Sequence, residues 1–237
     1  MNYTIDRFLG DKILLKQSKE GLRATSDSVL VAALVPVKKN ETILDVGAGN
    51  GIIGCCINAR TPCKITAIEI QNSLCSLIEE NAKQNNCQID LVKHDILLAK
   101  DPLKGKLFHH VVTNPPFYER SRNTRKNDEQ KKAFVQDFDL KKWLEYCLKH
   151  LRAKGSLNII HRPEMLAEIL PIMTKKLGNI DIFPICSKEG EKANRILIRG
   201  YLNKRGPLVL HSPLIMHTKN NKRTKSAEKI LRFGQAI

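Results

Sequence analysis

The chain has 237 residues, of which 42% are apolar and 27% charged, so its composition is that of an ordinary globular protein and excludes a disordered chain. Its 40 lysines and arginines exceed its 24 aspartates and glutamates and give a formal net charge of +16. Such a charge attracts polyanions, and nucleic acid is therefore the first partner to consider.

The first residues contain no apolar segment of the kind found in secretory leaders, and the sequence has no apolar run of 18 residues. The seven cysteines are odd in number and include no CxxC pair. This pattern indicates reduced thiols buried in the core rather than disulfides. We therefore expect a cytoplasmic protein.

Residues 1–40 are expected to form a lead-in and one capping helix. A polar, irregular or hairpin-like segment comes first. A serine or aspartate that can cap a helix then precedes an apolar run ending at Pro36, which predicts a buried helix over residues 26–36.

From residue 41 onwards, strand-like and helical segments alternate. The expected strands are 41–46, 64–70, 88–95, 107–114, 155–161, 179–186 and 194–202, and the expected helices are about 51–60, 71–85, 138–152 and 163–176. This alternation predicts an α/β fold with a doubly wound, mostly parallel, seven-stranded sheet. The short link between the last two strands suits a hairpin, so we expect an antiparallel strand near the C-terminal edge, with this pair closing the sheet. The domain should span residues 41–202, with the basic extension 203–237 packed on or beside it.

A glycine-rich loop lies between the first strand and the first helix of this alternation. One interpretation is GxGxxG at Gly49, Gly51 and Gly54, with Glu69 twenty residues after Gly49. That spacing is typical of a nicotinamide dinucleotide site.

The same loop also matches DxGxGxG, in which Asp45 precedes Gly47, Gly49 and Gly51. Asp45 would crowd an anionic pyrophosphate, whereas it suits a ligand that carries a positive amino acid or sulfonium group. S-adenosylmethionine is such a ligand.

Two further acids follow the next two strands. Glu69 can accept hydrogen bonds from both ribose hydroxyls of either cofactor. It therefore indicates a nucleoside but does not distinguish S-adenosylmethionine from a nicotinamide dinucleotide. Asp95 ends a later strand, where an adenine amino group could donate to it.

The segment 113–118, TNPPFY, follows an apolar strand at the sheet edge where open α/β sheets bind ligands. The two prolines hold Asn114 and Pro115 in extended conformations. The Asn114 side-chain oxygen and the Pro115 carbonyl can each accept a hydrogen bond from an exocyclic amine, while Phe117 stacks on the base. We expect Asn114, Pro115, Pro116 and Phe117 to form the catalytic segment.

In this order and at these separations, DVGAGNG, EI, HD and NPPFY resemble the class I methyltransferases with an Asn-Pro-Pro-aromatic motif, over about residues 40–120. The flanking segments GLRATSDSVLVAAL and RILIRGYLNKRGPLVLHSPLIMH resemble the small bacterial tRNA adenine-N6 methyltransferases that modify adenine 37. The resemblance implies S-adenosylmethionine as the cofactor and a structured RNA as the partner. It also implies that Thr25 and Asp27 lie over the methionine end of the cofactor.

The motif alone leaves other methyl acceptors open, namely guanine N2 in ribosomal RNA, a glutamine side chain and adenine in DNA. The glutamine enzymes carry a sizeable domain before the glycine loop and the guanine enzymes a duplicated one, and this chain has room for neither. From other classes, a nicotinamide-dependent oxidoreductase and a non-catalytic RNA-binding protein remain alternatives.

The segment 119–132, directly after the motif, is rich in basic residues. We expect it to hold RNA phosphates through Arg120, Arg122, Arg125 and Lys126. A target base would then be unstacked and swung into the pocket.

Three histidines are candidate metal ligands. His109 and His110 are neighbours in a strand and must point to opposite faces, so they cannot share an ion. We interpret them and His94 as core or rim residues and expect no bound metal.

Overall fold

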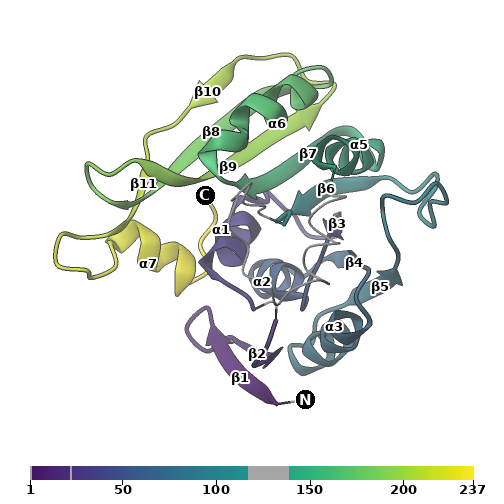
Figure 1. Ribbon diagram of the computed structural model, residues 1–237, viewed down its shortest axis with the longest axis horizontal. Coiled ribbons are helices and arrows are strands. Elements are labelled where there is room, and N and C mark those ends of the chain that lie inside the picture. The colour runs from purple at the N-terminus through teal and green to yellow at the C-terminus, as the bar shows by residue number, and fades with distance from the viewer. Residues whose placement is uncertain (1, 22, 117–138) are drawn as a thin grey trace, which may run out of the picture.

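The computed structural model describes residues 2–21, 23–116 and 139–237 (Figure 1). Its main sheet contains β3 (Thr42–Val46), β4 (Lys64–Glu69), β5 (Ile89–Lys93), β6 (Phe108–Thr113), β7 (Leu151–His161), β8 (Leu177–Lys188) and β9 (Ala193–Leu202). These seven strands run in the order β5-β4-β3-β6-β7-β9-β8, and β9 is antiparallel to both neighbours. The predicted mostly parallel α/β sheet is therefore confirmed.

Helices cover both faces of the sheet (Figure 1). They are α1 (Ser26–Leu34), α2 (Ile52–Arg60), α3 (Asn72–Gln84), α5 (Leu140–Lys149), α6 (Leu166–Met173) and α7 (Lys225–Leu231), with a 3₁₀ turn at Pro163–Met165. Consecutive strand residues point to opposite faces. Ile43 and Val112 accordingly pack with α1 and α2, whereas Leu44 and Val111 pack with α5 and α6. No helix in the described ranges is long and apolar enough to cross a membrane.

Helix α1 begins at Ser26, as the sequence suggested, and ends at Leu34, two residues earlier than expected. The capping residue is Thr25, which has extended backbone angles and accepts a hydrogen bond from the Asp27 amide at 3.3 Å through its hydroxyl. The expected serine or aspartate cap is therefore wrong, because Ser26 and Asp27 already lie inside the helix.

The lead-in forms an antiparallel hairpin of β1 (Tyr3–Phe8) and β2 (Ile13–Ser18). Asn81 of α3 and Asn85, which follows the last residue of that helix, bond the backbone of β2 as a neighbouring strand would. Asn81 bonds both the amide and the carbonyl of Lys16, at 2.7 and 3.0 Å, and Asn85 does the same for Leu14, at 3.0 and 2.9 Å. Such bonds satisfy an otherwise open strand edge.

The C-terminal extension adds two short strands, β10 (Leu208–Leu210) and β11 (Leu214–His217), which pair in parallel with β8. The expectation that the antiparallel pair closes the sheet is therefore wrong. The outer edge of β8 would present unpaired backbone groups, and the extension pairs with them. The division of the chain at residues 40 and 202 stays a prediction.

All seven cysteines are buried and unpaired, as expected for reduced core thiols. Burial raises the pKa of the Cys56 thiol to about 12, which keeps it protonated and unreactive.

Candidate active site

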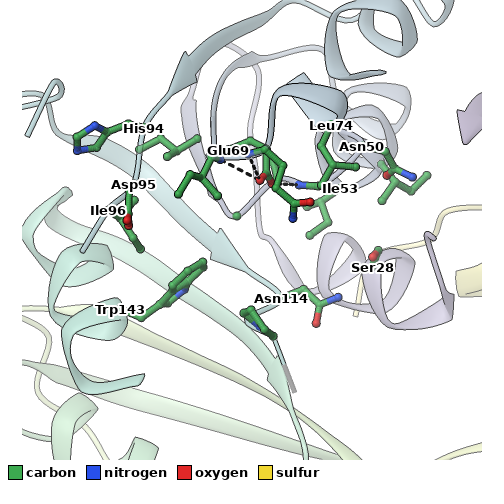
Figure 2. A pocket seen from close by; sticks show the side chains of 18 of the residues that line it. Ser28, Asn50, Ile53, Glu69, Leu74, His94, Asp95, Ile96, Asn114 and Trp143 are labelled. Atoms are coloured by element: carbon green, nitrogen blue, oxygen red, sulfur yellow. Dashed lines mark hydrogen bonds between the residues drawn. The ribbon is translucent and has the colours of Figure 1, made fainter. Parts of the chain in front are cut away.

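A cavity of about 560 Å³ opens at the sheet edge where β3, β4 and β6 end (Figure 2). Its lining includes members of the glycine loop, the turns after β4 and β5, and the segment after β6. The predicted site residues among them are Gly47, Gly49, Glu69, Asp95, Asn114 and Pro116. These residues come from four separate segments of the chain, and the fold brings them to one cavity.

The glycine loop adopts a backbone that few other residues could adopt. Gly47 has φ +72°, and a Cβ there would lie 2.8 Å from the Trp143 ring, so both conformation and space require glycine. The amides of Gly47 and Ala48 donate to the Ile68 carbonyl at 3.0 and 2.9 Å. Gly51 ends the loop as the residue that precedes α2. The loop is therefore fixed against β4 while part of its backbone faces the cavity.

Glu69 connects the glycine loop to the turn after β4. One carboxylate oxygen accepts from the Gly49 amide at 2.8 Å, and the other accepts from the amides of Ile70 and Gln71 at 2.9 and 3.0 Å. Figure 2 shows these bonds beside the cavity. A carboxylate has about four acceptor sites, so at least one remains for a ligand hydroxyl.

Asp95 lies in the turn that follows β5. Its carboxylate accepts from the Leu97 amide at 2.9 Å, and the residue also lines the cavity. A ligand amino group near this turn would meet an oriented acceptor.

Asp45 is a buried carboxylate without a partner. It is 1% exposed, and neither of its oxygens has a hydrogen bond within the described part of the chain. Desolvation raises its pKa to about 8, and repulsion from Glu69 adds to the rise. A buried carboxylate of this kind favours a nearby cationic or proton-donating group. Asp45 lies behind the loop rather than among the described residues that line the cavity.

The raised pKa of Asp45 predicts how stability changes with pH. Between the ordinary value near 4 and the folded value of about 8, the folded protein binds a proton that the unfolded chain has released, so stability falls as pH rises through this window. The free energy of unfolding of the wild type, relative to Asp45→Asn, should therefore fall by up to about 1.4 kcal/mol per pH unit. Urea denaturation at pH 5, 6, 7 and 8 measures this difference, and parallel pH profiles for the two proteins would contradict it.

The Asn114 side chain presents an unused acceptor at the cavity. Its Oδ1 is shielded from solvent and has no hydrogen-bond partner among the described residues. Pro115 is buried behind it, whereas Pro116 lines the cavity. Phe117 lies outside the described residues, as do Arg120, Arg122, Arg125 and Lys126, so their predicted roles stay predictions.

Thr25 and Asp27 are engaged elsewhere. Thr25 caps α1, and the Asp27 carboxylate accepts from Arg195 at 2.7 Å. In the described lining, this part of the chain contributes Arg23, Ala24 and Ser28 instead. The segment thus borders the cavity, whereas the side chains of Thr25 and Asp27 are not part of its described lining, and their predicted role at the cofactor stays a prediction.

The three histidines have separate surroundings. His110 is buried between Ser156 and Glu41, at 2.7 and 2.8 Å, and His109 lies 3.0 Å from the Thr42 hydroxyl. His94 lines the cavity. The described residues contain no group of three or more side chains able to hold a metal ion.

Trp143 is a cavity residue that the sequence did not single out. It lies on α5 among Leu140, Leu144 and Cys147, a pattern typical of a core face. The one signal was that it is the only tryptophan in the chain.

The fold and the cavity define a class I methyltransferase architecture, with a glycine loop after β3 and a buried acid, Glu69, at the end of β4. The sequence matches the family described as methyltransferase small domain over residues 18–188. The chain belongs to this family.

One curated relative and two solved structures show what this chain is similar to. The tRNA1(Val) (adenine(37)-N6)-methyltransferase of Shewanella putrefaciens is 26% identical over 182 residues, which are 75% of this chain and 76% of that protein. A solved structure described as a predicted O-methyltransferase from Agrobacterium tumefaciens has a TM-score of 0.73 at 24% identity and covers 89% of this chain and 98% of its own. The T. thermophilus 16S rRNA N2 G1207 methyltransferase, solved with AdoMet and guanosine, has a TM-score of 0.60 at 15% identity, covering 85% of this chain and 50% of its own.

Proposed function

We propose that the protein transfers a methyl group from S-adenosylmethionine to the N6 amine of an adenine in tRNA, and that the target is adenine 37 beside the anticodon. One observation carries the proposal. Asn114 lines the same cavity as the glycine loop, Glu69 and Asp95, and its shielded side-chain oxygen has no hydrogen-bond partner among the described residues. Membership of the methyltransferase small domain family argues against the alternative of a nicotinamide-dependent oxidoreductase.

The cavity residues suit the proposed cofactor. Glu69 would accept the ribose hydroxyls, Asp95 the adenine amine, and the glycine loop would accommodate the methionine portion. The buried Asp45 carboxyl has no hydrogen-bond partner among the described residues, and its pKa of about 8 keeps it mostly protonated near pH 7 when no cation is nearby. The positive charge of a bound cofactor would favour its ionised form. The cofactor supplies a strongly activated methyl group on a sulfonium.

The protein must then orient a weak nucleophile, because the lone pair of an adenine amine is delocalised into the ring. The Asn114 oxygen and the Pro115 carbonyl would accept its two hydrogens and direct the lone pair towards the methyl carbon. Alignment and oriented dipoles of this kind supply much of the rate enhancement in such reactions. No strong base is required, since the surplus proton can leave after transfer.

The choice of tRNA rests on charge and on relatives. The net charge of +16 favours a polyanionic substrate, and a base in an anticodon loop is cheaper to flip than one in a duplex. The Shewanella putrefaciens relative described above is named as an enzyme that methylates adenine 37 of tRNA1(Val). A cytoplasmic location fits this substrate and the unpaired cysteines.

The direct test is incubation of the purified protein with unmodified tRNA and isotope-labelled S-adenosylmethionine, followed by digestion and nucleoside mass spectrometry. We expect label in N6-methyladenosine. Label confined to N2-methylguanosine, or to a glutamine of an added release factor, would overturn the substrate assignment. Absence of transfer together with RNA binding would favour a non-catalytic RNA-binding protein.

The basic segment provides a separate prediction. Changing Arg122 and Arg125 to alanine should weaken tRNA binding and lower the slope of log K against log salt by up to about 2, because two phosphate contacts are lost. Filter binding at several salt concentrations measures both effects. Lys38→Ala with Lys39→Ala is the matched control. It removes the same charge before β3, at the opposite edge of the sheet from the cavity. Equal losses in the two double variants would contradict a local role.

A further inference from the structure

The Trp143 indole forms part of the cavity wall directly against the glycine loop. The residue is only 8% exposed and lines the cavity, and a Cβ on Gly47 would lie 2.8 Å from two ring carbons. Figure 2 shows the ring among the lining side chains, with Ile96 on one side and Asn114 on the other. The indole therefore touches the space where the proposed cofactor and substrate must meet.

Two consecutive hydrogen bonds connect this ring to β6 and β3, two of the strands that end at the cavity. The indole N–H donates to the Thr113 hydroxyl at 2.9 Å, and that hydroxyl donates to the Val46 carbonyl at 2.8 Å. Thr113 is fully buried, so the hydroxyl has no water to replace either bond.

These two hydrogen bonds lie at the point in the sheet where β3 and β6 separate. Thr113 and Val46 are the last paired residues of β6 and β3. Immediately beyond them, β3 becomes the glycine loop at Gly47 and β6 becomes the catalytic segment at Asn114. The Thr113 hydroxyl is thus a side-chain bridge at the point where the two strands diverge.

We propose that Trp143 is a positioning residue. Its ring forms a wall of the cofactor pocket and, through Thr113, fixes the distance between the glycine loop and Asn114. This inference rests on the proposed function, since it concerns the alignment of methyl donor and acceptor. A small misplacement of reacting atoms can lower a rate about 100-fold without removing any group that binds the cofactor.

The first measurement uses the wild-type chain, because Trp143 is its only tryptophan. Titration with S-adenosylhomocysteine should change the intensity or wavelength of its emission, with the same Kd as isothermal calorimetry gives. A calorimetric signal without any change in emission would overturn the contact while leaving the proposed function intact. No heat of binding would overturn both.

The second measurement separates positioning from packing. Thr113→Val removes the hydroxyl at nearly constant volume, and we expect kcat with tRNA to fall about tenfold or more while KM for S-adenosylmethionine changes less than about threefold. Thr113→Ser keeps the hydroxyl and should restore most of kcat. Trp143→Phe keeps an aromatic ring without the N–H donor, and its kcat should fall like that of Thr113→Val.

Thermal unfolding confirms that each variant is folded before its kinetics are compared. Wild-type kcat in Thr113→Val, or an equal loss of kcat in Thr113→Ser, would overturn the proposed role of the hydroxyl. If the valine variant is unfolded, Trp143→Phe decides, and wild-type kcat in that variant overturns the proposal.

Discussion

Replacing Asn114 with alanine is expected to lower kcat for methyl transfer about 100- to 1,000-fold, the scale observed when a fixed hydrogen-bond partner of a transition state is removed. The reason is that Oδ1 is a shielded acceptor with no partner in the described residues, so its role lies with the substrate amine. The affinity for S-adenosylhomocysteine should change little, because other residues form the proposed cofactor contacts. Single-turnover kinetics with tRNA and calorimetry with the coproduct measure the two quantities.

Two further variants sharpen this prediction. Asn114→Asp keeps an acceptor oxygen and should lose less activity than alanine does. Asn194→Ala is the matched control, since Asn194 is exposed on β9 and its side-chain amide donates to the Ser187 hydroxyl, away from the cavity. Unchanged turnover in Asn114→Ala would remove this residue from the mechanism.

Replacing Glu69 with alanine should weaken binding of S-adenosylhomocysteine about 10- to 100-fold, the equivalent of one strong hydrogen bond to a charged group. Two effects combine. The ribose loses its acceptor, and the amides of Gly49, Ile70 and Gln71 lose theirs, so the glycine loop is no longer tied to the turn after β4. Calorimetry measures the change in Kd.

The control for Glu69 is Glu79→Gln, an exposed acid on α3. It removes the same charge from the same region without touching the cavity, and its Kd should match the wild type. A wild-type Kd in Glu69→Ala would show that the cofactor binds elsewhere.

The sequence predicted the central sheet well because its signals are local. Most strands from β3 to β9 are local runs rich in apolar residues, and the glycine loop and the prolines at 115 and 116 mark where the chain must turn. The added strands β10 and β11 could not be predicted in the same way. They have three and four residues, and they form because β8, far back in the sequence, leaves an edge open.

The site was predictable where residues end strands, since the carboxyl ends of parallel strands meet at one edge. Glu69, Asp95 and Asn114 all follow this rule. Trp143 does not, because it reaches the cavity from the side of α5, and helical periodicity cannot distinguish a residue that lines a cavity from one that packs in the core. Thr25 and Asp27 differ again, because neighbouring residues of their segment line the cavity while Thr25 caps α1 and Asp27 bonds Arg195.

The most direct test of the central claim is a crystal structure of the protein with S-adenosylhomocysteine and an anticodon stem-loop of the substrate tRNA. We expect a flipped adenine whose N6 lies within hydrogen-bonding distance, about 2.7–3.2 Å, of both Asn114 Oδ1 and the Pro115 carbonyl. The coproduct sulfur should face that nitrogen from the glycine loop. A coproduct bound outside this cavity, or an Asn114 side chain turned away from the base, would contradict it.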